Sequence, residues 1–313
     1  MKYAIETNNL GRSYKTYTKK EGVLNSLKGF YNREYVEKVA LKEASIQIEA
    51  GKIVGLVGSN GAGKTTLLKI LSGLIYPSTG ECRVLGYQPW RRENEFLKQI
   101  SILLGQKNQL WWDITPRDSY SLLTKIYDLD PVQSKARVND LAHMLSCTNV
   151  LDTQLRRLSL GERMKMEIIG ALLHMPKVLF LDEPTIGLDI VAQTAIRDFL
   201  AQYVKDFKPA IILTSHYMDD ITHLADQLLL ISQGKIVYNG TVEEFSRTTD
   251  LEKKLVYRLK NSSEEKEIVY KSQNLTQILT DISHAGEVVD LKVEEVDFED
   301  IIHRFLATES RAR

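Results

Sequence analysis

The alternation of apolar and polar positions predicts an α/β domain in the first part of the chain. Residues 3–10 can form a short strand, and residues 39–58 can form two strands separated by a turn. Residues 64–73 show helical spacing that stops at Gly73, and glycine commonly follows the end of a helix. The opening stretch is therefore rich in strands, with one early helix.

From Pro116 onward helices replace strands, and proline is favoured at the first position of a helix. Apolar runs at 177–182 and 210–215 are typical of buried parallel strands. Residues 190–206, between those runs, have helical spacing. Strands that alternate with helices and are interrupted by a helical stretch indicate an α/β fold with a helical subdomain at about 113–176.

The pattern changes again after residue 240 and predicts a small α+β domain. Two strands, a helix, a third strand and a last helix follow one another. The predicted strands span 253–259, 265–270 and 287–293, and the predicted helices span 274–283 and 298–306. We therefore expect a larger domain over 1–245 and an accessory domain over 246–313.

The composition is that of a globular protein with a sizeable core, since 43% of residues are apolar and 26% are charged. The 41 basic residues balance 41 acidic ones, so net charge gives no reason to expect nucleic acid as a partner. The start, "MKYAIETNNL", lacks the apolar run that is typical of a signal peptide, and no stretch reaches the ~18 apolar residues of a membrane span. Cys82 and Cys147 show no metal-ligand spacing, so a reduced, cytoplasmic setting is expected.

The stretch "GSNGAGKTT" fits the phosphate-loop pattern G-x-x-x-x-G-K-[ST] and lies between an apolar strand and a helix, as that pattern requires. Its glycines let backbone N–H groups turn inward around a polyphosphate, beside the positive end of the helix dipole. Lys64 is expected to reach the β- and γ-phosphates, Thr65 to bind Mg²⁺, and Thr66 to support the α-phosphate. The predicted ATP-binding residues here are Gly58, Ser59, Asn60, Gly61, Ala62, Gly63, Lys64, Thr65 and Thr66.

A second element of this chemistry is "VLFLDEP", where two carboxylates follow a buried strand. Ligands of α/β sheets bind at the carboxyl ends of strands. Asp182 is expected to hold Mg²⁺ through water, and Glu183 to orient or deprotonate the attacking water. Lys64 and Glu183 are thus predicted catalytic residues.

The stretch "RRLSLGERMKM" contains Ser159 and Gly161 at the start of a predicted helix and resembles the signature sequence of ATP-binding-cassette (ABC) proteins. In the same order as in that family, "TIGLD" ends in Asp189 and "ILTSH" ends in His216. The resemblance covers about residues 3–240 and implies a P-loop ABC ATPase fold.

The resemblance also implies roles for individual residues. Ser159, Gly161, Glu162 and Asp189 would contact ATP, and His216 would contact the γ-phosphate as a catalytic residue. Gln106 would sense both Mg²⁺ and the attacking water, and Tyr14 would stack on adenine. Leu160 stands where the family usually has glycine, and Glu162 where it usually has glutamine, so the contacts of these two residues differ from the common form.

In this family the signature of one subunit completes the site of the other. The resemblance therefore implies a head-to-tail homodimer with two ATP molecules between its subunits, because this chain carries one set of motifs. One cassette with a short helical subdomain favours a transporter subunit over the ribosome- and DNA-acting classes. We expect a membrane permease on another chain and a peripheral position on the cytoplasmic side of the membrane.

The direction of transport is a finer prediction. The stretches "VDFEDIIHRFL", "LSLGER" and "EPTIGLD" resemble the drug- and polysaccharide-export branch, in a sub-branch similar to daunorubicin-resistance proteins. Export of an unidentified substrate is therefore favoured, and import or a non-transport ATPase are the alternatives.

Two segments keep two interpretations each. The basic segment 15–38 carries Val23, Leu27, Phe30 and Tyr31 at helical spacing, so it is either a solvated excursion or an amphipathic helix that docks near anionic lipid or the permease. For the adjacent Trp111 and Trp112, just after Gln106, either both fill the core of the helical subdomain or at least one anchors the permease.

Overall fold

The computed structural model describes residues 2–17, 35–105, 108–249, 252–260, 265–271, 275–295 and 298–311. The chain forms two compact units, Met1–Asn239 and Gly240–Arg313, which are described separately below. The predicted domain boundary between residues 245 and 246 stays a prediction.

A six-stranded sheet runs through the middle of the first unit in the order β10-β9-β4-β8-β7-β6. Its bounds are β4 Ile53–Val57, β6 Ile100–Leu104, β7 Val178–Asp182, β8 Ala210–Thr214, β9 Gln227–Ser232 and β10 Lys235–Thr241. The pairs β6–β7, β7–β8, β8–β4 and β4–β9 are parallel. Every residue of β4, β7 and β8 is buried, which confirms the expectation drawn from their apolar runs.

An antiparallel sheet forms a second layer of this unit. It consists of β1 Ile5–Tyr17, β2 Tyr35–Ala44, β3 Gln47–Ile48 and β5 Thr79–Val84. Strand β1 is longer than the predicted 3–10, because β2 supplies hydrogen-bond partners as far as the pair Tyr17 and Tyr35. The ends of the basic segment 15–38 therefore belong to paired strands, and residues 18–34, with the predicted amphipathic helix, lie outside the described residues.

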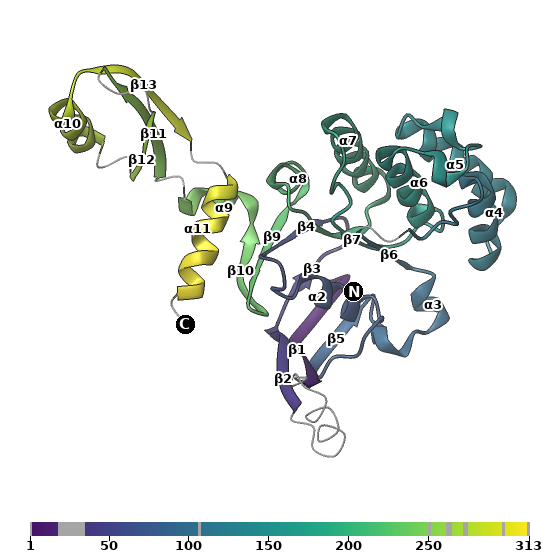
Figure 1. Ribbon diagram of the computed structural model, residues 1–313. Coiled ribbons are helices and arrows are strands. Elements are labelled where there is room, and N and C mark those ends of the chain that lie inside the picture. The colour runs from purple at the N-terminus through teal and green to yellow at the C-terminus, as the bar shows by residue number, and fades with distance from the viewer. Residues whose placement is uncertain are drawn as a thin grey trace, which may run out of the picture. The chain divides into compact units, whose positions relative to one another are not determined.

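Helix α2 (Lys64–Leu71) shares one apolar core with the antiparallel sheet and one face of the parallel sheet. The opposite face is covered by α6 (Leu160–Leu172) and α7 (Ile190–Phe207), with α8 (Met218–Leu224) nearby (Figure 1). Both faces of the parallel sheet are thus covered, and polar chemistry is left to the ends of its strands. Short helices follow β5: η1 Pro89–Arg91 and α3 Asn94–Leu97.

The helical part of this unit contains α4 (Pro116–Ile126) and α5 (Pro131–Met144) beside α6. Thr115 caps α4 by accepting a hydrogen bond from the Asp118 N–H, and Pro116 takes the first helical position as predicted. Two turns of 3-10 helix, η2 Thr148–Val150 and η3 Leu155–Arg157, lead to α6.

The second unit has the order helix, two strands, helix, strand, helix. Its elements are α9 Val242–Thr249, β11 Glu252–Leu259, β12 Lys266–Lys271, α10 Leu275–Ala285, β13 Val288–Glu295 and α11 Phe298–Arg311. The antiparallel sheet has the order β12-β11-β13, and its core contains Leu255, Tyr257, Tyr270 and Ile282. These elements confirm the α+β prediction for the end of the chain. Among the residues that the structure describes, no helix combines the length and apolar character needed to cross a membrane.

Candidate functional site

The loop between β4 and α2 has the backbone that a phosphate cradle requires. Gly63, the N-cap of α2, has a φ of 117°, which favours glycine strongly. Gly58 has no room for a side chain, because an added Cβ would lie 2.2 Å from the carbonyl oxygen of Ile231. The N-terminus of α2 therefore opens directly onto the loop, where its free N–H groups and helix dipole favour an anion.

Lys64 lies over this loop. Its side chain is buried, and Nζ donates to the carbonyl oxygens of Gly58 at 2.6 Å and Ser59 at 3.3 Å. Burial lowers the pKa of Lys64, while the nearby carboxylates of Glu183 and Asp182 act in the opposite direction. The ammonium group is thus held by the loop's own carbonyls, and its contact with phosphate stays a prediction.

The two predicted protein ligands of Mg²⁺, apart from Gln106, come together at the end of β7. Asp182 is buried, and its Oδ2 accepts a hydrogen bond from Thr65 Oγ1 at 3.0 Å, although these residues are 117 positions apart. Its Oδ1 accepts from Thr214 Oγ1 at 2.8 Å. Hydroxyl and carboxylate oxygens are the donors that Mg²⁺ prefers, so this donor set fits the ion.

Glu183 and His216 form the next pair along the same edge of the sheet. Oε1 of Glu183 lies 2.9 Å from Nε2 of His216. The backbone of Glu183 has a φ of 56°, and its N–H donates to the carbonyl oxygen and to Oγ1 of Thr214, at 3.1 and 3.0 Å. A left-handed conformation at a non-glycine residue costs free energy, so the bonds that the Glu183 N–H donates to Thr214 hold Glu183 in a backbone conformation that it would not favour alone.

The start of α6 holds the predicted signature residues. Ser159 is the N-cap, and it exchanges hydrogen bonds with Glu162: the Ser159 N–H donates to Oε2 at 2.9 Å, and Oγ accepts from the Glu162 N–H at 3.3 Å. The bond from the Ser159 N–H, and after it a second bond that the Ser159 hydroxyl donates to the same Oε2 at 2.8 Å, lower the pKa of Glu162. The sequence prediction missed this capping box, although the spacing Ser-x-x-Glu before an apolar helix signals it.

The signature residues also pack against the start of α7. An added Cβ on Gly161 would lie 2.9 Å from Cβ of Ala192, so the two helix starts meet closely at this glycine. Asp189 is the N-cap of α7 and accepts a hydrogen bond from the Ala192 N–H at 2.9 Å. Asp189 therefore caps α7, and its contact with ATP stays a prediction.

Two further predicted residues have different outcomes. Tyr14 lies on β1, where the guanidinium of Arg12 covers one face of its ring at 4.6 Å, and stacking on adenine stays a prediction. Gln106 lies outside the described residues, so its roles also stay predictions.

The segment after Gln106 is tied to α6 by a glutamate that the sequence pattern did not single out. Glu167 is 4% exposed and accepts hydrogen bonds from the Gln109 N–H at 3.1 Å and the Leu110 N–H at 3.2 Å. Burial raises the pKa of Glu167, and these two hydrogen bonds oppose the rise. Only the packing of the helices brings Glu167 to this segment, so no local spacing could have identified it.

Trp111 and Trp112 do not fill the core of the helical part. Each tryptophan is 42% exposed, whereas the preceding residue, Leu110, is buried and belongs to the apolar core. The guanidinium of Arg163 on α6 lies 4.9 Å from the ring centre of Trp112. The interpretation that both tryptophans are core residues is therefore wrong.

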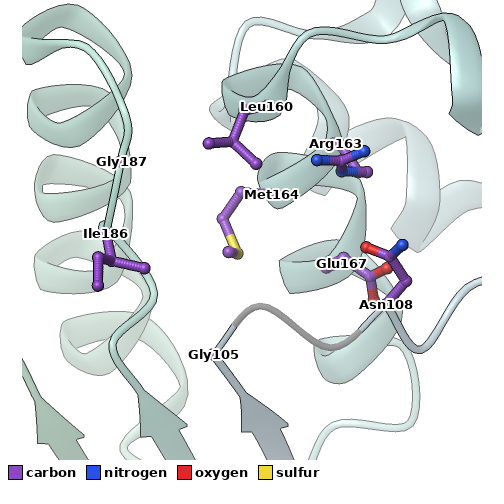
Figure 2. A pocket seen from close by; sticks show the side chains of 8 residues that line it. All are labelled: Gly105, Asn108, Leu160, Arg163, Met164, Glu167, Ile186 and Gly187. Carbon is purple, nitrogen blue, oxygen red and sulfur yellow. The ribbon is translucent and has the colours of Figure 1, made fainter.

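A pocket of about 350 Å³ lies between α6 and the segments that follow β6 and β7 (Figure 2). Leu160 and Met164 of α6 point toward the loop that carries Ile186 and Gly187. The pocket is lined by Gly105, Asn108, Leu160, Arg163, Met164, Glu167, Ile186 and Gly187. It separates the signature helix from the loop between Glu183 and Asp189.

Comparison with known proteins agrees with this geometry. A protein-family model described as "ABC transporter" matches residues 41–186. The ABC transporter ATP-binding protein NatA of Bacillus subtilis is 33% identical over 225 residues, which are 71% of this chain and 91% of that protein. The daunorubicin resistance ATP-binding protein DrrA3 of Streptomyces coeruleorubidus is 30% identical over 217 residues, which are 69% of this chain and 68% of that protein.

The fold has solved counterparts. A dimeric ATP-binding cassette in a post-hydrolysis state, bound to ADP and Pi, superposes with a TM-score of 0.62 at 19% identity. The alignment covers 76% of this chain and 98% of that one. At this identity the likeness is one of fold.

Proposed function

Because this chain belongs to the ABC transporter family as an ATP-binding subunit, we propose that it powers export of a substrate through a permease carried on a separate chain. Membership of the family confirms the resemblance predicted from the signature and the fold class, and makes the chain an ATPase that works in transport. The coverage of 91% of NatA, itself called an ATP-binding protein, supports a chain that supplies the ATPase without the permease.

The observation that carries the catalytic part of the proposal is the convergence of five residues at one edge of the sheet. Lys64 and Thr65 begin α2, Asp182 ends β7, and Glu183 follows it, 2.9 Å from His216. In this assignment Lys64 leaves the loop carbonyls and binds β- and γ-phosphate oxygens. Glu183 orients or deprotonates the attacking water, and His216 contacts the γ-phosphate from the end of β8.

Thr65 and Asp182 would hold Mg²⁺, with Asp182 acting through water and Gln106 completing the set. The ion, when bound, would neutralise charge that develops on the phosphate oxygens. The hydrogen bond from Thr65 to Asp182 keeps both oxygens at the phosphate loop and supports this assignment.

ABC ATPases dimerise, and we propose that this chain forms a head-to-tail homodimer with two ATP molecules between its subunits. Ser159 and Gly161 lie at the start of α6, where free N–H groups and the helix dipole favour a phosphate. Within the described part of the chain, the hydroxyl of Ser159 bonds to Glu162 and not to the phosphate loop. This supports the proposal that Ser159 and Gly161 contact the ATP bound at the phosphate loop of a second subunit.

The permease contact is proposed at Trp111 and Trp112, which places the subunit at the cytoplasmic side of the membrane. Two neighbouring tryptophans that are each 42% exposed provide a large apolar area with N–H donors, a combination enriched at interface hot spots. Arg163 beside Trp112 holds that ring in place and supplies a positive charge at the rim.

Export is supported by the likeness to DrrA3, a protein named for daunorubicin resistance. The test uses inside-out membrane vesicles that carry the subunit with its co-purified permease, and daunorubicin fluorescence as the probe. An exporter accumulates the probe inside these vesicles when ATP is added outside, and the Lys64→Ala complex is the matched control. ATP-dependent loss of probe from preloaded vesicles would support an importer, and purification without any membrane protein would support a non-transport ATPase.

A further inference from the structure

A buried carboxylate lies behind the catalytic pair, in a position that no motif assigned. Asp220, in the first turn of α8, is 1% exposed, whereas the side chain of its neighbour Asp219 is 76% exposed. A carboxylate buried to this degree costs several kcal/mol unless hydrogen bonds and charges compensate it. Its partners therefore indicate what it is for.

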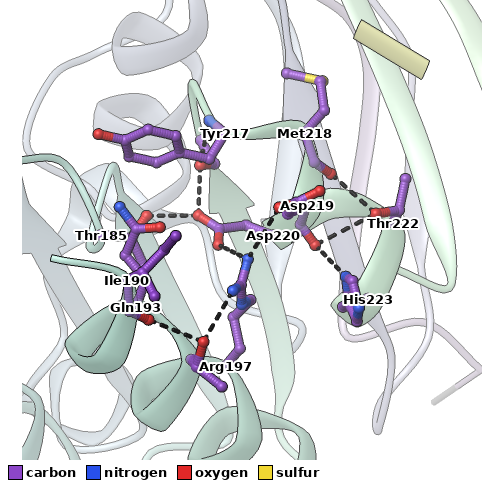
Figure 3. Close-up of polar contacts among 12 residues, drawn as sticks. Thr185, Ile190, Gln193, Arg197, Tyr217, Met218, Asp219, Asp220, Thr222 and His223 are labelled. Atoms are coloured by element: carbon purple, nitrogen blue, oxygen red, sulfur yellow. Dashed lines mark hydrogen bonds and ion pairs between the residues drawn. The ribbon is translucent and has the colours of Figure 1, made fainter. Parts of the chain in front are cut away.

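Two of these partners are hydroxyl groups on the loops that carry the catalytic pair, and Figure 3 shows the bond from the hydroxyl of Thr185. Oδ2 of Asp220 accepts hydrogen bonds from Thr185 Oγ1 at 2.5 Å and from Ser215 Oγ at 2.6 Å. Thr185 follows Glu183 by two residues, and Ser215 directly precedes His216. One carboxylate oxygen thus links the two loops just beside the contact between Glu183 and His216.

Ser215 fixes the His216 loop on both of its sides. Its hydroxyl donates to Asp220 and also accepts a hydrogen bond from the Tyr217 N–H at 3.0 Å. The Asp220 N–H donates to the carbonyl oxygen of Tyr217 at 3.1 Å. The residues on both sides of His216, Ser215 and Tyr217, are therefore held by hydrogen bonds that involve Asp220. The imidazole of His216 contacts Glu183 instead.

The third partner comes from α7. Nη1 of Arg197 lies 3.4 Å from Oδ1 of Asp220 and 3.8 Å from Oδ2 of Asp219, and Nη2 donates to Thr194 Oγ1 at 3.2 Å. The side chain of Arg197 is only 13% exposed, so its attraction to Asp220 is weakly screened. Because Gly161 of the signature packs against Ala192 in the first turn of α7, Asp220 joins the catalytic pair to the helix that the signature contacts.

We propose that Asp220 is a positioning residue that holds Glu183 and His216 in reacting geometry and joins both of them to α7. The inference rests on the roles proposed above for Glu183 and His216. Catalytic groups must be held to within about 0.5 Å, and a displacement of about 1 Å can lower a rate roughly 100-fold. Within the described residues no hydrogen bond of Asp220 reaches the phosphate loop, so binding of ATP does not depend on it.

The first test is Asp220→Asn, which keeps the shape of the side chain but loses the charge and one acceptor. We expect kcat for ATP hydrolysis to fall about 10- to 100-fold while KM for ATP stays within about twofold. The matched control is Asp226→Asn. Asp226 lies between α8 and β9, and its carboxylate accepts a hydrogen bond from the Ile53 N–H at 2.9 Å and pairs with Lys52. This control loses stability and keeps the kcat of the wild type.

A double-mutant cycle separates positioning from general loosening. Ser215→Ala and Thr185→Val each remove one hydroxyl, so each is expected to lower kcat by a smaller factor. If the hydroxyls act through Asp220, adding Asp220→Asn to either variant lowers kcat little further. Multiplied effects would mean independent losses and would overturn the proposal. Should Asp220→Asn fail to fold, the two hydroxyl variants carry the test by the same split between kcat and KM.

Different results would contradict the catalytic role of Glu183 and the positioning role of Asp220. Glu183→Gln is measured in parallel, and rapid hydrolysis by that variant would remove the catalytic assignment itself. Slow hydrolysis by Glu183→Gln together with a kcat within twofold of wild type for Asp220→Asn would overturn only the role of Asp220. A raised KM with unchanged kcat in Asp220→Asn would overturn it as well, because that result indicates a role in binding.

Discussion

The two places that the proposed ATP site requires are built differently in this chain. At the ends of β4, β7 and β8 the charged and polar groups pair with one another: Lys64 with loop carbonyls, Thr65 with Asp182, and Glu183 with His216. At the start of α6, within the part of the chain that the structure describes, Ser159 and Glu162 pair only inside their own helical turn, beside a Leu160 that is 41% exposed.

The difference separates chemistry from recognition. The edge of the parallel sheet brings together an ammonium group, a carboxylate and a histidine, of which Lys64 is buried while Glu183 and His216 are partly exposed. The start of α6 offers a helix dipole, a glycine and a hydroxyl, which can hold a phosphate but cannot activate water. Neither place is a complete site alone, which is the physical reason to propose that two subunits share each site.

The edge of the parallel sheet is the chemical half of the proposed site, and the start of α6 is its recognition half. Loss of Glu183 should have the largest effect on the chemical half. In Glu183→Gln we expect hydrolysis to fall about 10²- to 10⁴-fold with ATP still bound, because an amide cannot accept the proton of water. Gel filtration with ATP should then show a stable dimer. The control is Glu81→Gln, an exposed glutamate on β5. A turnover near that of the wild type would contradict the role assigned to Glu183.

Lys64→Ala should follow, with a loss of very roughly 3–4 kcal/mol in transition-state stabilisation, or about 10²- to 10³-fold in kcat. Lys69→Ala, at the other end of α2, is the control and should hydrolyse ATP normally. Activity of Lys64→Ala within a factor of two of wild type would contradict the phosphate site.

The same variant can test whether the two halves come from different subunits. Gly161→Ala should damage the signature, since its Cβ would approach Ala192 at 2.9 Å. A mixed dimer with Lys64→Ala has one site with both defects and one intact site, so mixing should restore up to about a quarter of the wild-type rate. A mixture no more active than the separate variants would oppose shared sites.

Much of the chemical half could be predicted from the sequence because its residues occur in short motifs next to strand ends. The phosphate loop and "VLFLDEP" predicted that Thr65 and Asp182 meet, and they lie 3.0 Å apart. The order of the motifs likewise brought Glu183 and His216 to one edge of the sheet.

The supporting contacts could not be predicted, because they depend on which way a side chain points after the helices pack. In "HYMDDITHL" nothing distinguishes Asp219 from Asp220, yet one is exposed and the other is 1% exposed. Glu167 is likewise one of several charged residues in a helix until packing brings it to Gln109. The length of β1 was also missed, since its polar half is a strand only because β2 pairs with it.

Trp112→Ala should have an intermediate effect and act on neither half directly. If Trp112 anchors the permease, its loss should cost about 2 kcal/mol of association, or roughly 30-fold in Kd for the purified permease. The ATPase rate of the isolated subunit should stay unchanged. Tyr76→Ala, at an aromatic that is 64% exposed elsewhere in the unit, should leave Kd as it is. Equal affinities of the two variants would contradict docking at Trp112.

The smallest effect is expected from Glu162→Gln, which tests whether the start of α6 is only a capped helix or already shaped by its ligand. Ser159 lowers the pKa of Glu162 in the folded state. The ionised carboxylate therefore stabilises the fold at any pH above the ordinary pKa of glutamate. That contribution is lost as pH falls through the lowered pKa. Glutamine can still cap, and Glu162 is partly solvated, so the variant should lose less than about 1 kcal/mol at neutral pH.

Urea unfolding should therefore show a small difference in the free energy of unfolding between wild type and Glu162→Gln at neutral pH. This difference should shrink in acid, where the protonated wild-type carboxyl is as uncharged as the amide of the variant. KM for ATP discriminates further. If Glu162 serves the cap alone, KM is unchanged. If KM falls in the variant, the carboxylate repels the phosphates that the partner subunit presents, and the start of α6 then takes part in ATP recognition through charge as well as through its N–H groups.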